Sequence, residues 1–111
     1  MTDLIEDKKE IDKIINEKIK GRKLIFTTHY RISSAEKGIE DKTVNDILQQ
    51  FDKVYAIEKD ILKHGDIGYE LFYKISNNTD FSIATCPLNG KLLIIHAVEY
   101  KRSLDKRFKK R

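Results

Sequence analysis

Hydrophobic positions in the first twenty residues recur at the spacing of an amphipathic helix. Charged and polar residues separate the apolar ones, which are Leu4, Ile5, Ile11, Ile14, Ile15 and Ile19. Intervals of three, four and seven residues place most of these side chains on one stripe. Thr2 suits the N-cap of this helix, and Gly21 suits the position just after its last turn. The pattern predicts an N-terminal helix within residues 1–21, whose stripe packs either on the rest of the chain or against a second copy.

The next segment changes from a strand pattern to two helix patterns. Residues 23–28, KLIFTT, are rich in β-branched and aromatic side chains, which favour a strand. A short helix is then expected to end at Gly38, because glycine commonly follows the last turn of a helix. A second helix is expected over about residues 41–51, where Val44, Ile47, Leu48 and Phe51 recur at helical spacing.

The second half of the chain has the pattern of strands joined by turns. Strands are predicted at residues 53–57, 69–75, 81–85 and 92–100, and the polar residues 58–68 are predicted to form a loop. Consecutive strands with short turns favour antiparallel pairing. We therefore expect one α+β domain with an antiparallel four- to five-stranded sheet, helices packed on one face, and the added N-terminal helix.

Size and composition restrict the class of protein. A chain of 111 residues suits one compact domain, and its abundant isoleucine, lysine and glutamate resemble the composition of thermophilic proteins. The single cysteine, Cys86, has no partner for an internal disulfide, which favours a reducing compartment and a buried, inert thiol. The charged N-terminus and the absence of a long apolar run favour a soluble cytoplasmic protein.

Positive charge is concentrated at one end of the chain. The net charge is +4, but residues 101–111, KRSLDKRFKKR, carry seven basic side chains against one acidic side chain. Such a basic tail is an electrostatic footprint for phosphate backbones, and the alternative is a solvated terminus without a ligand. The candidate phosphate-binding residues are Lys37, Lys101, Arg102, Lys106 and Arg107.

The stretch FTTHYRISSAEKGIEDKTVNDILQQFDKVY resembles the front half of small domains in the RelE/ParE-like toxin superfamily. The likeness is to a branch near the BrnT-type toxins, in which a strand and Thr-x-His precede a short helix, a basic-Gly-Ile motif, a second helix and a strand. The positions that match this pattern are Thr27, His29, Lys37, Gly38, Ile39, Val44 and Ile47. The resemblance covers roughly residues 23–101, and the N-terminal helix is an addition to it.

The resemblance implies a RelE-like core over residues 23–100 and a nucleic-acid-directed function, with RNA favoured over DNA. Members of this superfamily are often ribonucleases, while others poison gyrase or bind without cutting, and an antitoxin is a common partner. Two departures weaken an enzymatic interpretation. Ser33 stands where the pattern favours arginine four residues after the histidine, and Lys37 stands where it favours arginine before the glycine.

Cleavage of RNA without a metal needs a base, an acid and cations that stabilise the charged phosphorane. His29, His96 and Tyr100 are the candidate catalytic residues, because His29 lies at a strand-to-helix junction and His96 and Tyr100 fall on one face of the last strand. The alternatives are that His29 caps the helix or hydrogen-bonds a nearby strand, and that His96 is an ordinary polar residue of the surface. His64 is expected to be a loop residue without a special task.

Three hypotheses about function therefore follow from the sequence. The first is a metal-independent endoribonuclease of RelE-like architecture, for which no cofactor and no metal ligands are expected. The second is a non-catalytic module that binds nucleic acid or a protein such as an antitoxin. The third is a homodimer that pairs through the N-terminal helix.

Overall fold

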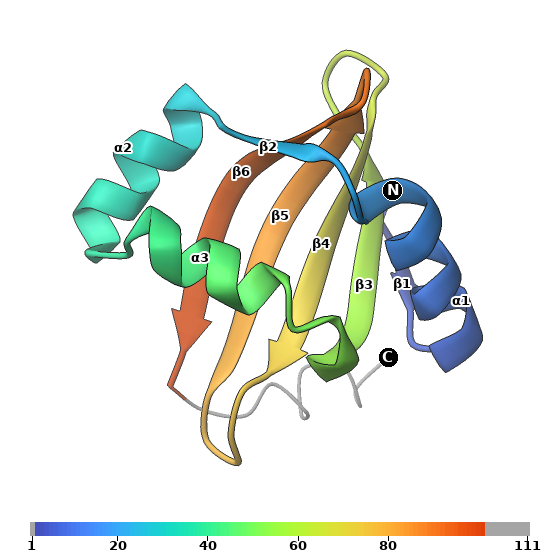
Figure 1. Ribbon diagram of the computed structural model, residues 1–111, viewed down its shortest axis with the longest axis horizontal. Helices are drawn as coiled ribbons and strands as arrows, with labels where there is room; N and C mark the ends of the chain where they lie inside the picture. The colour runs from blue at the N-terminus through green and yellow to red at the C-terminus, as the bar shows by residue number, and fades with distance from the viewer. Residues whose placement is uncertain (1, 102–111) are drawn as a thin grey trace.

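Six strands form one mostly antiparallel sheet, and helices pack on one of its faces (Figure 1). The computed structural model describes residues 2–101. The spatial order is β1-β3-β4-β5-β6-β2, and the strands are β1 (Thr2–Ile5), β2 (Lys23–Phe26), β3 (Val54–Ile61), β4 (Ile67–Lys74), β5 (Asp80–Leu88) and β6 (Lys91–Tyr100). The predicted α+β class is confirmed, but the sheet has six strands instead of four to five.

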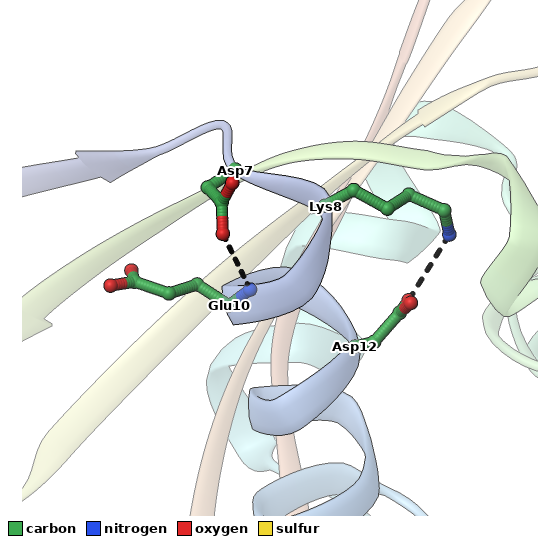
Figure 2. Close-up of polar contacts among 4 residues, drawn as sticks. All are labelled: Asp7, Lys8, Glu10 and Asp12. Atoms are coloured by element: carbon green, nitrogen blue, oxygen red, sulfur yellow. Dashed lines mark hydrogen bonds and ion pairs between the residues drawn. The ribbon is translucent and has the colours of Figure 1, made fainter.

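The extra strand is β1, and it corrects the predicted start of the first helix. β1 runs antiparallel to β3 and places Ile5 opposite Ile57. Helix α1 (Lys8–Ile14) begins only after Asp7, whose carboxylate accepts a hydrogen bond from the backbone N–H of Glu10 at 3.0 Å (Figure 2). Thr2 is therefore not an N-cap. The first residues instead complete hydrogen bonds along the edge of the sheet, and an aspartate satisfies the helix terminus.

The apolar stripe of the first helix packs within the chain. Helix α1 continues into a wider π-helical turn (Ile15–Ile19), and Ile11, Ile15 and Ile19 are each 2% exposed. These three side chains belong to the main hydrophobic core together with residues of the sheet. A dimer that used this stripe would first have to expose it, so the structure favours the core-packing alternative.

Two further helices cover the same face of the sheet. Helix α2 (Thr28–Lys37) ends at Gly38, which has a positive φ of 70°, and helix α3 (Asp41–Leu48) follows it. Tyr30 and Leu48 are buried in the same core as the α1 stripe. The hydroxyl of Tyr73 on β4 donates to the backbone carbonyl of Leu48 at 3.0 Å, which ties the end of α3 to the sheet.

The hairpins differ in part from their predicted limits. Strands β3 and β4 extend into the segment that was predicted as a loop, so the connection between them is residues 62–66. Strand β5 continues through Pro87 beyond the predicted end at residue 85, and Asn89 and Gly90 form the turn to β6 with positive φ values of 52° and 77°. Asn and Gly tolerate this conformation, which suits a two-residue hairpin.

Strand β2 is short, so the second half of β6 has no neighbouring strand on that edge. β2 lies parallel to β6 and pairs only with Lys91 to Ile94. Beyond Ile94, the free edge of β6 faces helix α2, which packs against this strand. This arrangement brings the first turn of α2 next to the middle of β6.

The sheet face opposite the helices is called the open face here. Alternation from the register places on it Ala56, Glu58, Asp60, Glu70, Phe72, Asp80, Ser82, Ala84, His96, Val98 and Tyr100. A small apolar cluster of Ala56 and Phe72 lies in this face, with Leu4, Tyr55 and Tyr100 packed against it. Within residues 2–101, no helix is long and apolar enough to cross a membrane.

Candidate acid-base site

Thr27 anchors the start of α2 to β6. Its backbone N–H and its hydroxyl both donate to the carbonyl oxygen of Ile94, at 3.2 Å and 2.9 Å. The same hydroxyl oxygen accepts a hydrogen bond from the backbone N–H of Tyr30 at 3.1 Å, which makes Thr27 the N-cap of the helix. The alternative in which His29 caps the helix is therefore wrong. His29 is the second helical residue and is exposed.

A β-bulge in β6 sets the direction of His96. The register between β5 and β6 shifts at this point, because Thr85 pairs with Ile94 while Ala84 pairs with His96. Ile95 is the extra residue, and bulges of this kind redirect neighbouring side chains. His96, Val98 and Tyr100 share the open face, as their alternation predicted. Ile95 does not share the other face with Ala97, as strict alternation along the strand would require, and instead lines a hollow on the open face.

The rings of His29 and His96 lie side by side, with centroids 6.4 Å apart and planes at 70°. The Nε2 atom of His96 lies 3.9 Å from a carboxylate oxygen of Glu70, which is longer than a hydrogen bond. Glu70, Ala84 and His96 occupy one row across β4, β5 and β6. Because the alanine side chain is small, the glutamate and the imidazole approach each other across the intervening strand.

Lys37 adds a positive charge to this group. Its Nζ atom donates to the carbonyl oxygen of Ala97 at 3.2 Å, next to His96 on the free edge of β6. Lys37 lies eight residues after His29 in α2. Because residues four apart are neighbours on one face of a helix, residues eight apart lie on that same face, two turns from each other. The structure therefore brings together three of the predicted site residues, His29, Lys37 and His96, and adds Glu70.

Burial lowers the pKa of His96 below its ordinary value of 6.5. The negative charge of Glu70 opposes this shift, and the charges of Lys37 and His29 reinforce it. The imidazole of His96 is therefore mostly neutral at pH 7, which is the form that accepts a proton.

Tyr100 does not join the two imidazoles. It lies opposite Asp80 and packs against the cluster of Ala56 and Phe72. Tyr100 lies four positions after His96 in β6, which corresponds to roughly 13 Å along a strand. Tyr100 is therefore removed from the candidate catalytic residues, because it is too far away to share a proton with His96.

The predicted phosphate-binding cations are only partly described. The Nζ atom of Lys101 lies 3.7 Å from a carboxylate oxygen of Glu99, and its side chain is 84% exposed. An ion pair this exposed contributes little to stability, so the charge of Lys101 is available to solvent. Arg102, Lys106 and Arg107 lie outside the described residues.

Carboxylates that are not among the predicted site residues dominate the open face beside the imidazoles. Glu58, Asp60 and Glu70 line a hollow of about 150 Å³, which Ala84 and Ile95 also border. Glu70 could be predicted from its alternation with Tyr69 and Leu71 in the expected strand. The other two were missed because residues 58–68 were expected to form a loop.

Other chemistry-bearing side chains stand apart from this site. Among residues 2–101, no three histidine, cysteine, aspartate or glutamate side chains gather as metal ligands would. Cys86 is 2% exposed, and burial, with a smaller contribution from Asp66, raises the pKa of its thiol. His64 is exposed in the connection between β3 and β4.

The arrangement can exchange protons with a ligand at the edge of the sheet. One imidazole is exposed, the other is half-buried, and they come from different elements of the fold. A comparison with known protein families, curated proteins and solved structures found no match to this chain. The likeness to RelE/ParE-like toxins therefore stays a prediction.

Proposed function

We propose that this chain is a small, cytoplasmic, RNA-directed protein of RelE-like architecture, and that it cleaves phosphodiester bonds without a metal. The observation that supports this proposal most is the approach of His29 and His96, which lie far apart in the sequence and 6.4 Å apart in the fold. Two imidazoles with a nearby ammonium group provide the base, the acid and the cation that such a reaction needs.

The reaction assigns a separate task to each side chain. Neutral His96 would accept the proton of the ribose 2′-hydroxyl, and the 2′-oxygen would attack the phosphorus. The bond from phosphorus to the 5′-oxygen would break, and protonated His29 would donate its proton to that oxygen. The products are a 2′,3′-cyclic phosphate and a free 5′-hydroxyl, so no water is consumed in this step. Lys37 would stabilise the negative charge of the phosphorane.

Glu70 would be a positioning residue in this scheme. Its carboxylate lies 3.9 Å from Nε2 of His96. A nearby negative charge favours the imidazolium form, which develops when His96 accepts the proton. Because the carboxylate opposes the effect of burial on His96, the Glu70→Gln variant should lower the pKa of His96 further and shift the acid limb of the pH–rate profile to lower pH.

Cleavage of a labelled single-stranded RNA tests the proposal. The His29→Ala and His96→Ala variants should each lose at least about 100-fold in rate, since a positioned acid or base contributes roughly 10²- to 10⁴-fold. His64→Ala is the matched control, because this third histidine is exposed and lies in a hairpin connection. The proposal fails if the wild-type protein cuts no faster than the His29 and His96 variants.

A non-catalytic nucleic-acid-binding module is the second candidate. It is favoured by the absence of arginine at position 33 and by the contact of the Lys37 amine with the carbonyl of Ala97. In this case RNA would bind with a steep dependence on salt and remain intact. A protein partner such as an antitoxin is a further proposal, and binding to it would not show that dependence.

A further inference from the structure

We propose that a hollow on the side of the sheet that carries the helices binds the phosphate group of a small phosphate monoester. The hollow is called the anion hollow below, and its polar side chains are Lys18, Arg22, Tyr69 and Asn89. It lies where β5 turns into β6, at the other end of β6 from Tyr100 (Figure 1). The inference concerns a second site and does not rest on the proposed ribonuclease activity.

Three segments that are distant in the sequence form the anion hollow. Lys18 and Arg22 come from the end of the first helix, Tyr69 from β4, and Asn89 from the β5–β6 turn. The hollow has a volume of about 250 Å³, and a second hollow of about 220 Å³ shares Lys18 and Tyr69 with it. Together they fall within the range of roughly 300–1,000 Å³ that small-molecule sites occupy.

The backbone that presents the two cations is unusual. The π-helical turn is closed by the backbone N–H of Lys20, which donates to the carbonyl oxygen of Ile15 at 2.9 Å. Such turns are rare and frequently occur at functional sites. Gly21 follows with a positive φ of 77°, a conformation that glycine adopts without steric cost. The chain therefore reverses after the helix, and Arg22 borders the same hollow as Lys18.

The hydroxyl of Tyr69 is the observation that points to a ligand. Tyr69 is 6% exposed, and its side chain belongs to the main core while it borders the anion hollow. Its backbone carbonyl accepts a hydrogen bond from Thr85 at 2.7 Å, but within residues 2–101 its hydroxyl has no hydrogen-bond partner. Polar groups that are buried to this degree are nearly always paired. A ligand in the hollow would provide the missing partner.

The polar groups around the anion hollow can all donate hydrogen bonds. Lysine and arginine side chains only donate, and asparagine and tyrosine side chains can donate. Burial raises the pKa of Tyr69 above its ordinary value of 10, so its hydroxyl keeps its proton at pH 7. None of the described carboxylates borders this hollow, whereas Glu10 and Glu17 border the second one. A ligand with many acceptor oxygens therefore suits the anion hollow.

The two cations favour an anion of high charge. In the part of the chain that the structure describes, neither Lys18 nor Arg22 forms an ion pair. Arg22 is half-buried, and a charge that loses part of its water is stabilised by an opposite charge. A guanidinium group binds phosphate oxygens through two hydrogen bonds, and an ammonium group binds them as a point charge. A phosphate monoester carries a charge of about −1.5 to −2 at pH 7, which matches the two cations.

Apolar side chains form the rest of the wall and indicate an organic group on the phosphate. They are Ile67, Pro87 and Leu88, and Leu88 is 37% exposed although it is large and apolar. An aromatic or aliphatic group beside the phosphate would cover these side chains, which inorganic phosphate cannot do. The small volume favours a free ester over a longer strand.

Titration of the ¹⁵N-labelled full chain with phenyl phosphate, followed by NMR, tests the inference directly. We expect saturable shifts of the amide signals of Lys18, Arg22 and Asn89, and unchanged signals at His29 and His96. Inorganic phosphate should bind more weakly than phenyl phosphate, and phenol should leave these signals unchanged. The inference is overturned if the shifts are confined to the two histidines, or if inorganic phosphate binds as tightly as the ester.

Substitutions measure the contribution of each polar group. Arg22→Gln should weaken phenyl phosphate binding by about 10-fold or more, because charge-assisted hydrogen bonds are the strong ones. Tyr69→Phe removes only the hydroxyl and should weaken binding by about 2- to 10-fold without disturbing the core. Lys42→Gln on α3 is the matched control for charge, because this lysine is exposed and lies outside the hollow. Unchanged affinity in both the Arg22 and Tyr69 variants would overturn the inference.

Competition against phenyl phosphate separates a free ester from the phosphorylated end of an RNA strand. Adenosine 5′-monophosphate should displace the probe, and a tetranucleotide with a 5′-phosphate should displace it less well. Equal or better displacement by the tetranucleotide would contradict the assignment of a small ligand. Arg22→Gln should still cleave RNA, and His96→Ala should still bind phenyl phosphate, so this inference and the proposed function can fail separately.

Discussion

The imidazole ring of His29, in the first turn of α2, lies 6.4 Å from the ring of His96 in the middle of β6. Three local features produce this relationship. Thr27 anchors the helix to the carbonyl of Ile94, β2 ends before it would cover this part of β6, and a bulge at Ile95 turns His96 to the open face. The pair depends on the whole arrangement and not on a short motif.

Loss of the Thr27 side chain should destabilise the fold and the site together. Its hydroxyl caps α2 and also bonds to Ile94, so Thr27→Ala should cost about 1–2 kcal/mol of unfolding free energy. Thr27→Ser keeps both hydrogen bonds and should lose much less. Urea denaturation of the three proteins measures the difference, and equal midpoints for the alanine and serine variants would contradict it.

The stripe of the first helix should behave as core and not as a dimer interface. Ile15→Ala removes a side chain that is 2% exposed, and should lower the free energy of unfolding by about 2–5 kcal/mol. Ile14→Ala, at a half-buried neighbouring position, should cost less. The loss should be the same at low and high protein concentration. A loss that shrinks on dilution would indicate that a second copy covers the stripe.

Acid should weaken the fold through His96. The folded protein holds the pKa of this residue below 6.5, the ordinary value that applies to the unfolded chain, so the unfolded state binds more protons between the two values. Stability should therefore fall as the pH drops below about 6.5, and level off below the folded pKa. His96→Gln should lose this component, whereas His64→Gln should keep it. Urea unfolding from pH 5 to 8 checks the difference between these variants.

RNA binding should depend on the charges of residues 102–111, called the basic segment here. Neutralising two of them with Lys106→Gln and Arg107→Gln should weaken binding and lower the slope of log affinity against log salt by about 1.4, at roughly 0.7 for each phosphate contact with a single strand. Lys9→Gln with Lys13→Gln on the exposed side of α1 is the matched control. Fluorescence anisotropy across a salt series gives both slopes. Equal slopes for the two double variants would argue against phosphate contacts by the segment.

The sequence predicted the elements of the fold better than their limits. Helical periodicity from Ile11 to Ile19 predicted the first helix, because its stripe is long enough to be distinctive. β1 was missed because four edge residues, Thr2 to Ile5, extend the same periodicity by chance and gain their hydrogen bonds from β3. The polar sequence from Glu58 to Ile61 predicts a loop, but these residues continue the β3–β4 hairpin.

The site was predictable only in its separate parts. His29, His96 and Lys37 were identified by residue type and position, but their approach depends on a pairing of β2 with β6 that no local pattern shows. The strong preference of helix N-caps for threonine over histidine was a signal that favoured Thr27 as the cap. The row of Glu70, Ala84 and His96 required the strand register, which alternation alone does not provide.

A defined RNA with a single 2′-deoxy nucleotide tests the central claim most directly. The account predicts that the wild-type protein cleaves the all-ribose strand to a 2′,3′-cyclic phosphate and leaves the deoxy position uncut. It also predicts that His29→Ala and His96→Ala lose this cleavage while His64→Ala retains it. Cleavage at the deoxy position, or full activity in the His29 and His96 variants, would contradict the assignment of these two residues as acid and base.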